Sequence, residues 1–229
     1  MMQIRRHLLE FGGDMDGLLR SPPESLSRGR ALAVFFICGG FYGAVMATFS
    51  LTTTRLPLVV FGTIKVPILF GCTMFLAIPG FYVLNALRGV GADFGKVLSL
   101  LLGYQLRVAV ILAALAPITA LINLSVTAEA YQLVQFWNSL AFLTAATVAQ
   151  IRFATQAREL VKRDFRHRLL LRFWTVLYAF VGIQMAWTLR PFIGSPDRGV
   201  GFFREGKLDN AYVQIFEIFR ELLGSILGF

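Results

Sequence analysis

The sequence predicts an all-α fold, a polytopic membrane helical bundle of about five transmembrane helices plus amphipathic N- and C-terminal helices. Two observations carry this prediction. Of the 229 residues, 56% are hydrophobic and only 15% are charged, whereas soluble domains hold about 25% charged residues. The apolar residues also gather into runs of the length, about 20 residues, that a spanning helix needs.

The positive charge of the chain indicates contact with lipid. The formal net charge is +9, from 22 basic and 13 acidic residues. The basic residues lie between apolar runs, which is typical of side chains that face anionic lipid headgroups and orient a protein in its bilayer. No phosphate-binding loop or RNA-binding signature accompanies them, so nucleic acid is not an expected partner. Cys38 and Cys72 lie inside apolar runs and are expected to be small buried residues.

The N-terminal half predicts a tail and two spans. Residues 1–30 form a cytoplasmic tail that either lies amphipathically in the headgroup plane or is loosely ordered. The first span is 31–51, where Gly39, Gly40 and Gly43 allow another helix to approach closely. The next run is divided into an interfacial or re-entrant piece, 57–65, and a second span, 66–87. Lys65 is then expected to snorkel at the boundary.

Three further spans are expected at 97–123, 131–151 and about 171–189, the last two joined by a basic linker, 152–172. Together they complete a five-span membrane domain, 31–193. The final region, 194–229, is expected to be an exoplasmic loop followed by an amphipathic helix. Glu217, Arg220 and Glu221 lie in the middle of its last apolar stretch, and charges at a bilayer centre are costly.

The basic residues also predict the orientation, because cytoplasmic loops carry the excess of Lys and Arg. The tail, the 88–96 turn and the 152–172 linker would share one side, which predicts a cytoplasmic N-terminus and an exoplasmic C-terminus. The expected location is a bacterial inner membrane, with the C-terminus periplasmic. Six basic residues are candidates for headgroup contact: Arg28, Arg30, Lys162, Arg163, Arg166 and Arg168.

Two stretches resemble a known family. Residues 66–89, VPILFGCTMFLAIPGFYVLNALRG, and 170–197, LLRFWTVLYAFVGIQMAWTLRPFIGSPD, are similar to Yip-type five-span membrane proteins and to related uncharacterised bacterial multi-pass proteins. The resemblance covers roughly residues 57–215. It implies a cytosolic N-terminus; the eukaryotic members are linked to membrane trafficking and small GTPases, a role that the resemblance does not carry to this chain.

Arg107 is the most unusual residue, because it lies ten residues into the expected third span. A charge there needs a partner, a cavity or the interior of a bundle, and no acidic residue lies in any expected span. Three interpretations stay open: an anion or substrate site, an ion pair with another subunit, or an arginine bound by internal amides and carbonyls. The candidate amides are Gln105, Asn138, Gln150 and Gln184.

A second group of candidate binding residues follows the last span: Gln184, Trp187, Arg190 and Asp197. They would form either an exoplasmic docking surface or a packed loop that closes the bundle. No carboxylate pair, Ser/His/Asp set or metal-ligand spacing is visible, so neither catalysis nor a cofactor is expected. The sequence therefore favours an accessory or scaffold subunit that binds other membrane proteins. The alternative is a small transporter or channel with a site near Arg107.

Overall fold

The computed structural model describes residues 28–49, 56–194, 200–203 and 212–213. The expected amphipathic helices at the two ends, within 1–30 and 194–229, fall almost entirely outside these residues. The described residues form helices and turns with no β-strand. The elements are α2 (Arg28–Met46), α3 (Leu56–Leu87), the 3-10 turn η3 (Gly91–Asp93), α4 (Phe94–Ser125), the 3-10 turn η4 (Ala128–Ala130), α5 (Tyr131–Arg163) and α6 (Arg166–Thr188).

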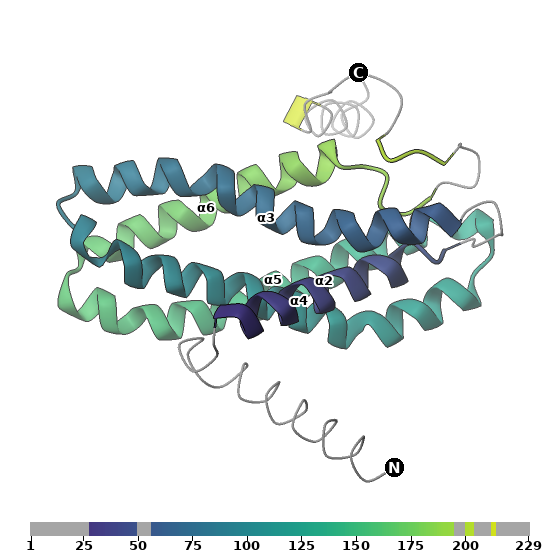
Figure 1. Cartoon of the computed structure of the whole chain (residues 1–229), viewed down its shortest axis with the longest axis horizontal. Helices are drawn as coiled ribbons and strands as arrows, with labels where there is room; N and C mark the ends of the chain where they lie inside the picture. Colours follow the sequence, from purple (N-terminus) through teal and green to yellow (C-terminus); the bar gives the residue numbers. More distant parts are fainter. Residues whose placement is uncertain (1–27, 50–55, 195–199, 204–211, 214–229) are drawn as a thin grey trace, which may run out of the picture.

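Three long helices, α3, α4 and α5, run antiparallel along the whole length of the bundle (Figure 1). Each has 32 or 33 residues, about 48 Å at 1.5 Å per residue. The two shorter helices cover different parts of that length: α2 begins part-way along and continues toward the 126–130 end, and α6 starts at the 164–165 end and stops part-way (Figure 1).

Four helices are long and apolar enough to cross a membrane: α2, α3, α4 with its preceding turn, and α6. This confirms an all-helical protein with membrane-spanning helices. Within the described residues, α5 is less apolar than these four helices, because Gln132, Gln135 and Asn138 lower the hydropathy of its uncharged first half and its second half contains the charged segment RELVKR. The fifth span remains a proposal.

The division of residues 57–87 into two pieces was wrong. α3 is one continuous helix that contains both Pro67 and Pro79. Proline is tolerated in membrane helices because neighbouring helices and Ser/Thr side chains satisfy the freed backbone groups. The expected basic linker 152–172 is also mostly helical, because α5 continues to Arg163 and α6 begins at Arg166.

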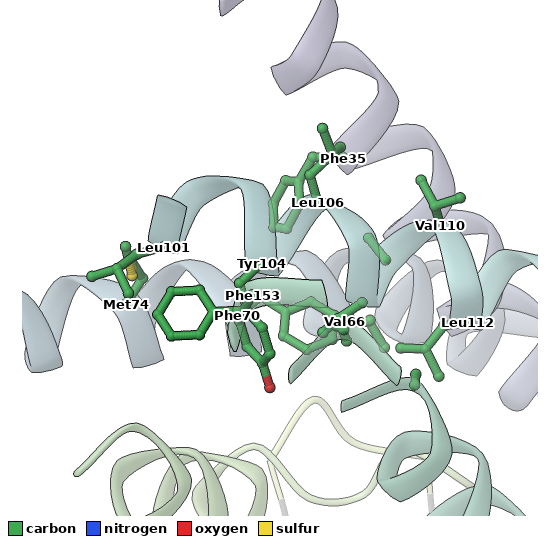
Figure 2. Packing of buried hydrophobic residues seen from close by; sticks show 14 of the residues in the cluster. Phe35, Val66, Phe70, Met74, Leu101, Tyr104, Leu106, Val110, Leu112 and Phe153 are labelled. Atoms are coloured by element: carbon green, nitrogen blue, oxygen red, sulfur yellow. The ribbon is translucent and has the colours of Figure 1, made fainter. Parts of the chain in front are cut away.

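The close approach predicted for the glycines of the first span is confirmed. α2 packs on α3 with the backbones of Gly43 and Gly62 in contact, so that a Cβ atom on either would overlap the other residue. The apolar core continues from this contact through α4 and α5, and includes Phe35, Val66, Phe70, Leu106 and Phe153 (Figure 2).

Candidate functional site: a buried arginine in the centre of the bundle

Arg107 lies near the middle of α4, in its most enclosed part. Every residue from 103 to 110 is buried, on all sides of the helix, because α2 and α5 pack against α4. The Arg107 side chain is only 2% exposed. It stands 13 residues from the start of α4, about 20 Å along the axis. The guanidinium is therefore held deep inside the apolar part of the bundle.

Among the described residues, no hydrogen bond joins the guanidinium to Gln105, Asn138 or Gln150. Its Nε and Nη1 atoms are buried and find no hydrogen-bond acceptor among the described residues. The candidate amides bind elsewhere. Gln105 donates to the Phe70 carbonyl at 2.7 Å and to the Tyr178 hydroxyl at 3.0 Å. Gln150 donates to the Thr175 hydroxyl at 3.0 Å.

Asn138, the third candidate amide, is also occupied. Its Oδ1 accepts a hydrogen bond from the Tyr42 hydroxyl at 2.9 Å, and its Nδ2 donates to the Val134 carbonyl at 2.8 Å. This pair joins α2 to α5 inside the core. The interpretation in which Gln105, Asn138 or Gln150 satisfies Arg107 is therefore wrong: these side chains hold helices together instead.

In the described part of the chain, no carboxylate lies near Arg107 to balance its charge. The acidic residues of the five helices and their turns are Asp93, Glu129, Glu159 and Asp164, all toward the ends of the bundle. Asp93 is 14 residues away along the helix, about 21 Å, where attraction between unit charges is about 1 kcal/mol at an effective dielectric of 20. An anion in contact, at about 4 Å, would gain about 4 kcal/mol by the same measure. Burial is the main cost to the Arg107 charge, and Arg152 of α5 adds a smaller repulsion.

An aromatic cluster lies one helical turn from Arg107. The Tyr104 ring makes edge contacts with Phe153, Trp174 and Tyr178, at centroid distances of 6.0, 5.7 and 5.6 Å. These rings join α4, α5 and α6, and Tyr104 and Phe153 both appear in Figure 2. They close the bundle on the 164–165 side of Arg107 with apolar surface.

Lys65 does not snorkel to a boundary, as the sequence analysis expected. Its side chain is fully buried, and its Nζ donates to the Pro191 carbonyl at 2.6 Å. The rings of Phe202 and Phe192 lie 4.8 and 6.0 Å from the same Nζ. Lys65 is held inward because the chain after α6 returns across α3 and covers it. Lys65 thus fastens Pro191, Phe192 and Phe202 to the bundle.

The candidate residues at the end of α6 are only partly brought together. The Arg190 guanidinium stacks on Trp187, with Cζ 3.0 Å from the ring centroid, and its Nε donates to the Trp187 carbonyl at 3.2 Å. Gln184 is half-buried one turn earlier. Asp197 lies outside the described residues. Arg107, on α4, makes no hydrogen bond through its Nε or Nη1 atom to Gln184, Trp187 or Arg190.

The basic residues selected for headgroup contact fall into two groups. Lys162, Arg163, Arg166 and Arg168 are all exposed at the turn between α5 and α6. Arg28 and Arg30 belong to the first turn of α2. That helix begins part-way along the bundle, so these two residues lie apart from the turn between α5 and α6 (Figure 1).

His167, in the same basic cluster, is buried although the arginines beside it in the sequence are exposed. Its side chain is 1% exposed, and its Nε2 lies 3.4 Å from the Asp93 carboxylate. Arg166 reinforces this corner: its Nη1 donates to the Arg88 carbonyl at 2.9 Å, and its Nε donates to Asp164 at 2.8 Å. The Arg166 guanidinium holds the pKa of the Asp164 carboxyl below its usual value.

Within the described ranges, no group of three or more His, Cys, Asp or Glu side chains is placed to hold a metal ion. Comparison with protein-family models, with curated proteins and with solved structures found no match.

The buried position of Lys65 was the main feature that sequence reasoning missed. A signal existed, because Lys65 interrupts a 31-residue apolar run, but its partner Pro191 lies 126 residues away.

Proposed function

We propose that this chain is a non-catalytic integral membrane protein that acts as an accessory or scaffold subunit of a larger membrane complex. The supporting observation is the surface of α6. This helix packs mainly on α3. Of the four helices that could span a membrane, it has the smallest share of buried residues. Phe173, Val176, Phe180 and Ile183 are all exposed along it. A helix so little covered offers an apolar face to another membrane protein.

The proposal includes α5 as a fifth span. α5 returns from the 126–130 end of the bundle to the 164–165 end, antiparallel to α4 (Figure 1). It buries Val134, Asn138, Ala141, Ala145 and Ala149 along one side. The distribution of basic residues supports a cytoplasmic N-terminus and a C-terminus on the opposite side of the membrane. The proposed location is a bacterial inner membrane with the C-terminus in the periplasm, as for the bacterial proteins that the sequence resembles. The resemblance to Yip-type proteins agrees with this topology.

A second candidate function, a small transporter or channel with a site near Arg107, is favoured by one observation. The Arg107 guanidinium is buried in the centre of the bundle with Nε and Nη1 lacking acceptors among the described residues. Intramembrane charges of this kind mark substrate or ion pathways in many membrane proteins.

Purification from native membranes tests the scaffold proposal. In mild detergent, with crosslinking before extraction, we expect a membrane protein to co-purify in fixed ratio with the chain. Val176→Trp, which adds bulk to the exposed face of α6 while keeping it apolar, should abolish that association. Leu143→Trp is the matched control, because Leu143 is similarly exposed on α5, at 63% against 68%. Isolated monomers, or equal loss with both variants, would contradict the proposal.

A further inference from the structure

We infer that Arg107 is the centre of a binding site for a small monovalent anion of the chloride class, held between α4 and α5. The basis is a guanidinium that is 98% buried and has two donor nitrogens without an acceptor in the described part of the chain. A buried charge is stable only when it is paired and hydrogen-bonded. The site is independent of whether the chain acts as a scaffold or a transporter.

The enclosure of Arg107 selects a small ion over a larger acidic group. Residues 103–110 are buried on every side of α4, so a carboxylate on a helix of another subunit would have to displace α2 or α5 to reach the guanidinium. A lipid phosphate is also badly placed, because Arg107 is about 20 Å along α4 from its nearer end. α5 packs along α4 and buries the small residues Ala145 and Ala149 on one side, and small side chains leave more room for an ion than large ones.

Arg152 supplies a second positive charge. It is exposed on α5, and it acts electrostatically on Arg107. Two arginines that repel each other without an intervening carboxylate are both stabilised by an anion nearby. Arg152 therefore strengthens the site and attracts the ion from the outer side of α5, whereas Arg107 supplies the hydrogen bonds. Neutralising Arg152 should weaken binding, and neutralising Arg107 should abolish it.

The test uses the full-length protein, purified in detergent and exchanged into sodium gluconate, whose anion is too large for the site. Sodium chloride, nitrate, sulfate or phosphate then replaces gluconate at constant ionic strength, and unfolding is followed by tryptophan fluorescence. A ligand that binds only the folded state raises the unfolding temperature in a saturable way. We expect this response for chloride and nitrate, several-fold weaker binding in Arg152→Met, and no response in Arg107→Met.

Arg158→Met is the matched control, because Arg158 is exposed on α5 and lies outside the site; it should respond like the unchanged protein. An unchanged protein without a saturable response, or an equal response in Arg107→Met, would overturn the inference. If Arg107→Met fails to fold, the test is the line width of the chloride-35 nuclear magnetic resonance signal in the presence of the unchanged protein. Broadening of this signal that is reversed by excess nitrate would support the site. No such broadening would refute it. A phosphate response that disappears when residual lipid is restored would assign the site to a lipid headgroup instead and would also refute it.

Discussion

The contact between α2 and α3 gives the sharpest prediction about the fold. A Cβ atom on Gly62 would lie 2.9 Å from the Cβ of Ala47 and 3.1 Å from the backbone C of Gly43, and closer still to the Gly43 carbonyl oxygen. Real Cβ atoms essentially never approach other atoms within 3.0 Å. Gly62→Ala must therefore push the two helices apart, and overpacking of this kind costs about 1–3 kcal/mol.

Gly71→Ala is the matched control on the same helix. A Cβ atom there would meet nothing within 4 Å, so only the higher helix propensity of alanine remains, a gain of about 1 kcal/mol. We expect the two variants to differ by about 2–4 kcal/mol in the free energy of unfolding, combining these two terms. The measurement is equilibrium unfolding in mixed micelles of mild detergent and dodecyl sulfate. Equal stability of the two variants would refute the close backbone contact.

Three further predictions concern buried or linking polar groups. Tyr42→Phe leaves the Asn138 Oδ1 without its 2.9 Å donor and should lower the free energy of unfolding by about 1–3 kcal/mol, measured in the same micelles; no change would refute the bond. Lys65→Met removes a buried charge and its bond to Pro191 together, so stability should change little, while limited proteolysis at residues 189–203 should speed up; unchanged cleavage would contradict the fastening role. Because Arg166 lowers the pKa of Asp164, the stabilisation from that pair is present above the ordinary carboxyl pKa and is lost as the pH falls through the lowered value. Asp164→Asn should flatten the acid side of the stability curve, and an unaltered curve would argue against the pair.

The general fold was predictable because apolar run length depends only on local sequence. The runs placed α2, α3, α4 and α6 close to their observed positions, and the glycines of α2 correctly indicated a close helix contact. The proline-based division of α3 failed, because the cost of proline inside a helix depends on neighbouring helices rather than on the residues beside it. The burial of Arg107 was anticipated for the same local reason, its position within a run.

Partnerships over long sequence distances were not predictable. Tyr42 bonds to Asn138 across 96 residues and Lys65 to Pro191 across 126 residues, and no local pattern identifies either pair. The burial of His167 is a similar case, since its sequence neighbours are exposed arginines but its side chain lies against Asp93 in another turn. Sequence reasoning therefore found the unusual charges but not the groups that face them.

The central claim, a five-span membrane protein, depends on α5, and cysteine accessibility across that helix tests it most directly. With Cys38 and Cys72 replaced by alanine, single cysteines are placed by Thr127→Cys before α5 and by Lys162→Cys at its far end. In intact spheroplasts, a membrane-impermeant maleimide should label position 127 at once, and position 162 only after the membrane is permeabilised. Labelling of both positions from the same side would contradict the five-span account.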